Sequence, residues 1–155
     1  MTDYLQRAIS NSGQFFVFAC DTTQLVSEAC RRHDVGPTAA AALGRALTGT
    51  ALLAALLKDE QSVKLRFEGN GPLGKIVVEA DPMCIVHGYV GNPDVDLPLK
   101  DGRFDIPCAL GRAGLLTVSK DLQLKTPYQG VVNLMASEIA EDLAFMELHV
   151  DVDEA

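Results

Sequence analysis

The glycine run at residues 69–74, GNGPLG, has the spacing of a chemical site. Gly69, Gly71 and Gly74 match G-x-G-x-x-G, in which glycines let a backbone approach a pyrophosphate at the amino terminus of a helix. The residues that follow, 75–79, are β-branched and predict a strand instead of a helix. No helix dipole would therefore face this loop, which argues against a phosphate site there. A small-molecule or nucleotide site at Gly69 to Gly74 is kept only as our alternative hypothesis.

Four cysteines could in principle bind a soft metal or form disulfides. Cys20, Cys30, Cys84 and Cys108 stand far apart, with no Cys-x-x-Cys motif and no paired histidine spacing. In a reducing compartment such residues are usually small buried hydrophobes. We therefore expect no metal or other cofactor in this chain, and keep a redox pair such as Cys20 and Cys30 as the alternative.

The residues do not predict an enzyme. His33, His87 and His149 fall in different predicted elements, whereas zinc or iron needs three or four convergent ligands. The sequence contains no Gly-x-Ser-x-Gly, the local pattern of a hydrolase nucleophile. Residue chemistry alone indicates a folded domain without an evident active site.

Charge and hydropathy exclude two classes of partner. The formal net charge of −8 opposes a phosphate backbone and an anionic membrane surface, so we expect neither nucleic acid nor membrane as a partner. The most apolar stretch, residues 46–57, is shorter than the about 20 residues needed to span a bilayer. The amino terminus does not resemble a secretory signal, which predicts a cytoplasmic protein.

The first third of the chain predicts a hairpin followed by two helices. Residues 4–9 and 14–20 have strand composition, and Asp21 can cap a helix that has Gln24 at its N3 position. Residues 38–58 form the longest regular segment and are dominated by Ala and Leu. A helix that is apolar on nearly every side is typical of a central core element or an interaction helix, and we expect core.

From Ser62 the apolar period changes to two, which indicates strands. Strands are predicted at residues 62–68, 75–80, 84–90, 115–120 and 128–134, the first three as an antiparallel meander. The proline- and glycine-rich residues 91–114 predict a long loop. A last helix begins at Ser137, with Ile139, Leu143 and Met146 spaced i, i+4, i+7, and residues 148–152 alternate like a short strand. The fold class is therefore α+β, one domain over residues 1–155, with a largely antiparallel sheet packed against the long helix and shorter helices.

Six segments of the chain resemble the heat shock protein 33 family, in the family's order. They are DYLQRAIS from Asp3, HDVGPTAAAALGRALTGTALLAALLKDE from His33, GNGPLGKIVVEAD from Gly69, VHGYVGNPDVDLP from Val86, LTVSKDLQLKTPYQG from Leu116 and SEIAEDLAF from Ser137. Together they cover nearly everything from Asp3 to Phe145. The chain therefore resembles the amino-terminal domain of that family.

The resemblance implies an ATP-independent holdase chaperone that binds unfolding proteins through exposed apolar surface under oxidative or heat stress. The family commonly forms homodimers, so a second copy is an expected partner, either intact or with exchanged segments. Its redox switch is a carboxyl-terminal module in which Cys-x-Cys and Cys-x-x-Cys hold zinc. Oxidation expels the metal and unfolds a linker over the client site, because the metal supplies the folding energy of such a small module.

This sequence departs from the family at that switch. None of its cysteines matches the switch positions, and the resemblance fades after Phe145. We therefore expect a holdase core without redox control, in which zinc enters only if a longer parent protein carries the four-cysteine module. A non-functional truncated product is a further alternative. We predict client contacts at Leu56, Leu57, Phe145 and Met146, near the ends of helices, with plain core packing as the alternative for each.

Overall fold

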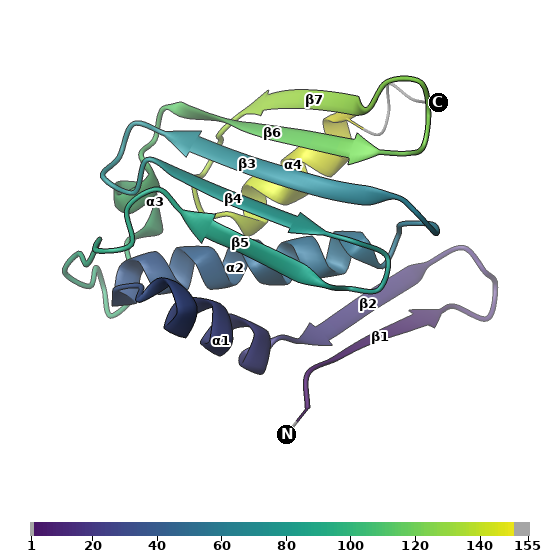
Figure 1. The fold of residues 1–155 in the computed structure, drawn as a ribbon, viewed down its shortest axis with the longest axis horizontal. Helices are drawn as coiled ribbons and strands as arrows, with labels where there is room; N and C mark the ends of the chain where they lie inside the picture. Colours follow the sequence, from purple (N-terminus) through teal and green to yellow (C-terminus); the bar gives the residue numbers. More distant parts are fainter. Residues whose placement is uncertain (1, 151–155) are drawn as a thin grey trace.

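The computed structural model describes residues 2–150 and arranges them as a sheet, a hairpin and four helices (Figure 1). In chain order the elements are β1 (Tyr4–Ile9), β2 (Phe16–Asp21), α1 (Thr23–His33), α2 (Pro37–Ala54), β3 (Ser62–Gly69), β4 (Lys75–Ala80), β5 (Val86–Val90), α3 (Ile106–Leu110), β6 (Gly114–Asp121), β7 (Tyr128–Asn133) and α4 (Ala140–Val150). The predicted α+β class is confirmed.

The main sheet has the strand order β5-β4-β3-β6-β7, and every neighbouring pair is antiparallel. Its central strand β3 shows why the chain folds this way. Val63, Leu65 and Phe67 point inward and are fully buried, while the charged residues between them face solvent. The alternation seen in the sequence thus fixes which face of the sheet covers the core.

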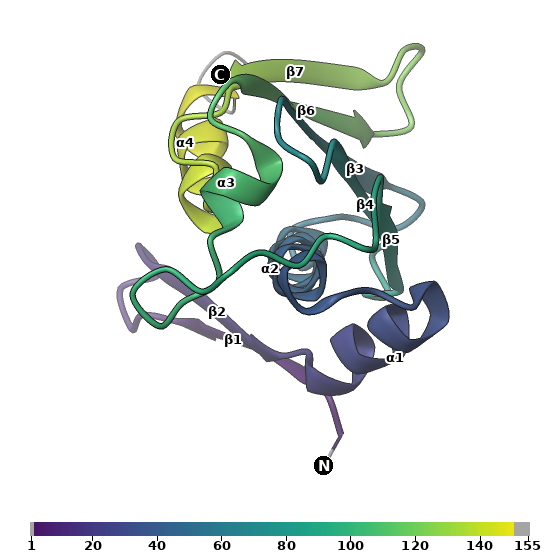
Figure 2. The same ribbon diagram turned by 90° about the vertical axis from the view of Figure 1, so that its left-hand side faces the viewer.

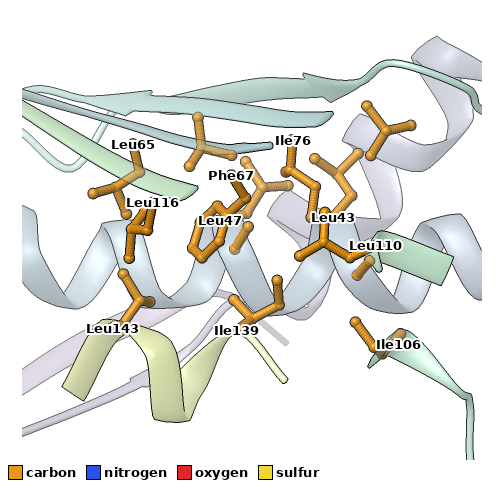
Figure 3. Close-up of a cluster of buried hydrophobic side chains, with 14 of the residues drawn as sticks. Leu43, Leu47, Leu65, Phe67, Ile76, Ile106, Leu110, Leu116, Ile139 and Leu143 are labelled. Carbon is orange, nitrogen blue, oxygen red and sulfur yellow. The ribbon is translucent and has the colours of Figure 1, made fainter. Parts of the chain in front are cut away.

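Helix α2 lies at the centre of the molecule, as its apolar sequence predicted. Figure 2 looks along α2, with the sheet on one side of it and α1, α4 and the hairpin around the rest. Leu43 and Leu47 of α2 meet Phe67, Ile76 and Leu116 of the sheet in the core (Figure 3). Each such leucine, once fully buried, contributes about 1.5–3 kcal/mol to stability.

The predicted capping box of α1 is wrong in its details. The N-cap residue is Thr22, and the helix amides are bonded by the distant Asp3. Its carboxylate accepts hydrogen bonds from the backbone N–H groups of Gln24 at 2.8 Å and Leu25 at 2.7 Å. Asp21 accepts the backbone N–H of Thr23 at 2.9 Å and the hydroxyl of the same residue at 2.7 Å. The start of β1 is therefore fastened to α1 by an anion at the positive end of the helix dipole.

The predicted loop over residues 91–114 contains the short helix α3, which the proline- and glycine-rich composition did not predict. Asp105 caps this helix by accepting the N–H of Cys108 at 3.1 Å, and Pro107 lies in its first turn. Proline is tolerated there because the first helical N–H groups have no partner within the helix. The Asp-x-Pro pattern at residues 105–107 is the sequence signal that could have predicted the start of this helix.

The carboxyl-terminal prediction also needs correction. Residues 148–150 belong to α4, not to a strand, and residues 151–152 lie outside the described part of the chain. The helix begins at Ala140, because the buried carboxylate of Asp142 orders the preceding turn. That carboxylate accepts N–H groups from Met135, Ala136 and Ile139 at 2.7 to 3.3 Å. Helix α2 likewise ends at Ala54, not at residue 58.

Candidate functional site

The hairpin of β1 and β2 projects from the body of the protein (Figure 1). Within residues 2–150 these two strands pair only with each other, so both outer edges of the hairpin lack a strand partner. Phe15, Phe16 and Val17 expose 69%, 65% and 61% of their surface. An isolated two-stranded sheet is at best marginally stable in water. The hairpin therefore presents apolar side chains and free backbone edges together.

One face of the hairpin looks onto a cleft. Ile9 pairs with Phe16, and Phe18 lies two residues further on, so these three side chains share a face. A cleft of about 610 Å³ separates them from Leu56 and Leu57, which follow α2. Its lining is mostly apolar and also includes Arg7 of β1. This cleft, together with the exposed hairpin residues, is called the hairpin surface below.

A larger groove, of about 1000 Å³, runs from the base of the hairpin across α1, α2 and α4. Small residues of α2 in its lining let the flanking helices approach closely. A Cβ at Gly44 would lie 2.9 Å from Val26 of α1, and one at Gly49 would collide with Leu143 of α4. The groove thus continues the hairpin surface with an apolar floor built by three helices.

Polar side chains also line or border this groove. The hydroxyls of Thr22 and Thr48 are hydrogen-bonded at 2.7 Å, and Arg45 forms a 2.7 Å ion pair with Glu138. The polar atoms of these side chains therefore bond to one another in pairs, and they do not converge on one point inside the groove. The arrangement suits an apolar polypeptide segment better than a substrate that needs oriented catalytic groups.

The structure separates the four residues predicted to contact clients. Leu56, 58% exposed, and the half-buried Leu57 line the cleft beneath the hairpin. Phe145 on α4 is half-buried and stacks on His149 with 3.9 Å between ring centroids. Met146 is only 1% exposed and belongs to the core, so it offers no surface to a partner in this fold. The core alternative holds for Met146.

Sequence reasoning missed the hairpin aromatics as candidate site residues. The run FFVF at residues 15–18 indicated a strand, and apolar strand residues normally face a core. Composition could have indicated their exposure to a partner. The run has no charged residue and no proline, and these are the residues that usually protect an exposed strand edge from pairing.

The glycine loop does not have the geometry of a pyrophosphate cradle. Its backbone amides are engaged, since Gly71 donates to the carbonyl of Leu110 at 2.8 Å and Leu73 to that of Ala109 at 2.9 Å. A Cβ at Gly69 would also collide with the Leu110 carbonyl. The glycines therefore let the β3–β4 turn pack against the carboxyl end of α3.

The thiols are arranged differently from the Cys20 and Cys30 pair that was the alternative hypothesis. Cys20 and Cys84 line one pocket of about 210 Å³, at the junction of β2 with the β4–β5 turn. Burial raises the pKa of the Cys20 thiol, and the nearby Asp21 and Cys84 raise it further. Burial chiefly raises the pKa of Cys84 as well, with Asp81 adding to it. These thiols stay protonated near neutral pH, which lowers their reactivity.

Neither a cluster of metal-ligating side chains nor a membrane-spanning helix occurs in the described part of the chain. In residues 2–150 no three metal-ligating side chains gather closely enough to hold an ion. No helix in that range has the length and apolar character required to cross a bilayer.

Comparison with known proteins gives one consistent result. The sequence model of the Hsp33 protein family matches residues 3–145. A 33 kDa chaperonin of Desulfotalea psychrophila is 57% identical over 145 residues, which are 94% of this chain and 49% of that protein. The 33 kDa chaperonin of Citrifermentans bemidjiense is 60% identical over 93% of this chain and 49% of its own length. The chain thus spans about half the length of these curated relatives.

A solved structure agrees in fold as well as sequence. The crystal structure of the 33 kDa chaperonin, a heat shock protein 33 homolog, from Thermotoga maritima superimposes with a TM-score of 0.91 at 37% identity. The match covers 96% of this chain and 51% of that one. Since both the family's sequence pattern and its fold extend over nearly the whole chain, the protein belongs to the Hsp33 family.

Proposed function

We propose that this chain is an ATP-independent holdase core, which captures unfolding proteins on its hairpin surface under oxidative or heat stress. The observation that carries the proposal is the exposure of Phe15, Phe16 and Val17 on a projecting hairpin. Contiguous apolar surface of this kind marks a site for proteins or other apolar partners. The chaperonin names of the relatives support a chaperone role over an enzymatic one.

The physical basis of capture would be burial combined with strand addition. Each 100 Å² of apolar surface removed from water on binding contributes about 2.5 kcal/mol before the costs of association. The free edges of β1 and β2 offer backbone groups to an extended segment, as in other cases of strand addition. Backbone pairing does not depend on sequence, which suits a partner that is any unfolded protein.

Assembly, location and regulation form a second layer of the proposal. A homodimer through the same hairpin surface, intact or with exchanged segments, would cover the apolar residues when no client is present. We place the protein in the cytoplasm, with neither nucleic acid nor membrane as a partner. Zinc control is proposed only for a longer parent protein that carries the four-cysteine module.

The alternative of a nucleotide site at Gly69 to Gly74 is weakened because the amides of that loop bond to α3. A polypeptide without chaperone function is the competing hypothesis, and it predicts no suppression of aggregation at all.

The test is light scattering of a heat-aggregating enzyme with and without this protein. We expect suppression at a several-fold molar excess, and we expect the double variant Phe16→Ser/Val17→Ser to lose most of it. Leu99→Ser is the matched control, because Leu99 is 58% exposed on the loop between β5 and α3, at the opposite end of the molecule (Figure 1). No suppression by the parent protein, or equal loss in both variants, would refute the proposal.

A further inference from the structure

A two-residue turn between β5 and α3 brings two cations together. Lys100 and Arg103 form a closed backbone pair, in which each N–H donates to the other residue's carbonyl at 2.9 Å. Asp101 and Gly102 between them have φ values of 50° and 74°, both in the left-handed region, as a type I′ turn requires. Directly opposed residues place their side chains on one face, where like charges destabilise the pair. The turn therefore holds two positive charges together at an energetic cost.

A third cation faces the same space. Arg112, which follows α3, lines a hollow of about 370 Å³ together with Lys100 and Arg103. Phe104, 38% exposed, and Pro107 contribute apolar wall to this hollow. The buried apolar residues of α3 anchor that wall in the core. The three cations thus surround a preformed concave site, in the size range of small-ligand pockets, about 300–1,000 Å³.

The acidic residues around the hollow are mostly committed elsewhere. Asp105 accepts the N–H of Cys108 as the cap of α3, and Glu138 pairs with Arg45 at 2.7 Å. Asp101 is the remaining carboxylate in the lining. Within residues 2–150 none of the three cations forms an ion pair with an acidic side chain. With Glu138 paired to Arg45, the three cations face two carboxylates, Asp101 and Asp105, so the hollow keeps one net positive charge on a protein whose net charge is −8.

We propose that this hollow binds a compact multivalent phosphate anion, such as pyrophosphate or the diphosphate group of a nucleotide. Two guanidinium groups can each bind phosphate oxygens through two N–H groups, and the Lys100 ammonium adds a point charge. An anion bound there would relieve the repulsion between Lys100 and Arg103. If the anion belongs to a nucleotide, the ring of Phe104 offers a face for the base. The hollow shares no lining residue with the cleft of the hairpin surface, so anion binding can be tested independently of client capture.

Isothermal titration calorimetry at low salt tests the proposal, with pyrophosphate and adenosine diphosphate as the two probes. We expect both to bind, and the double variant Arg103→Gln/Arg112→Gln to weaken binding by at least about tenfold. Lys64→Gln is the matched control: Lys64 is an exposed cation on the outer face of β3, outside the hollow, and its loss should change the affinity less than about twofold. Thermal melting followed by circular dichroism verifies that the variants are folded.

The two probes distinguish the sources of the anion. Tighter binding of adenosine diphosphate that falls to the pyrophosphate level in Phe104→Ala supports a nucleotide, whereas equal binding of both probes supports free pyrophosphate. The absence of heat from both probes at about 1 mM, or unchanged affinity in the folded double arginine variant, would overturn the proposal.

Discussion

The carboxylate of Asp3 accepts the backbone N–H of Leu25 at 2.7 Å, across 22 positions of sequence. A second N–H, from Gln24, binds the other oxygen of the same carboxylate at 2.8 Å. The residue that precedes β1 thus closes the amino end of α1, and it fixes the base of the hairpin against the helix that β2 leads into.

Replacing Asp3 with Ala should lower the free energy of unfolding by about 1 kcal/mol, because two helix amides lose their acceptor. Urea unfolding followed by circular dichroism measures the change. Asp59→Ala, an exposed acid in the turn after α2, is the control and should stay within about 0.5 kcal/mol of the parent protein. Equal stability of the Asp3→Ala variant would show that the cap does not contribute.

Met146→Ser and Leu148→Ser should behave differently, although both residues lie on α4. Met146 is 1% exposed, so the change creates a cavity and buries a hydroxyl, at a cost of about 2–5 kcal/mol. Leu148 is 69% exposed, and its change should cost no more than about 0.5 kcal/mol. Thermal denaturation of the two variants measures the contrast. Similar melting temperatures would mean that Met146 is not held in the core.

Glu28 should titrate far below an ordinary glutamate. Hydrogen bonds from Arg31 first and Arg32 second lower the pKa of its carboxyl from 4.5 to about 2. A depressed folded-state pKa means that the stabilisation is complete above pH 4.5 and is lost as the pH falls toward 2. NMR titration of the Glu28 side-chain carboxyl carbon reports the pKa directly. The substitution Arg31→Gln should raise the pKa of Glu28. Arg66→Gln is the control and should leave that pKa unchanged, because Arg66 pairs with Glu68 instead.

Alkylation with iodoacetamide near pH 8 should modify Cys108 first. Cys108 is exposed, whereas burial raises the pKa of Cys20, Cys30 and Cys84 and leaves a smaller fraction of reactive thiolate. Raising the pH increases that fraction, so the slow thiols should react faster in more alkaline buffer. Mass spectrometry of the modified peptides follows each site. Early modification of Cys20 or Cys84 would contradict the burial that the structure shows.

Local patterns predicted most of the elements because the forces behind them act over a few residues. Strands β1 and β4 begin and end where residue composition placed them, and the central position of α2 followed from its apolar faces. The cap by Asp3 could not be predicted, since its partners lie more than twenty residues away. Helix α3 was not predicted, because a segment rich in proline and glycine indicates a loop. Only the Asp-x-Pro cap at its start indicates a helix.

The candidate site was predictable only in part for a related reason. The spacing of Ile139, Leu143 and Met146 already indicated the core face of α4, which argued against Met146 as a surface residue. Leu56 and Leu57 were selected for their place near the end of a helix, and the structure puts them in the cleft. A period of two marks a strand but does not reveal whether anything covers it. The exposure of the hairpin therefore emerged only in three dimensions.

The sparse attachment of the hairpin has a consequence for how the molecule moves. Within the described residues β1 pairs with β2 alone, and neither strand belongs to the main sheet. Segments of this kind can open locally at a small fraction of the global unfolding free energy. The β1–β2 hairpin can therefore change its conformation to bind partners of different shapes while the sheet and α2 keep their structure. Adaptability and stability are assigned to different parts of one short chain.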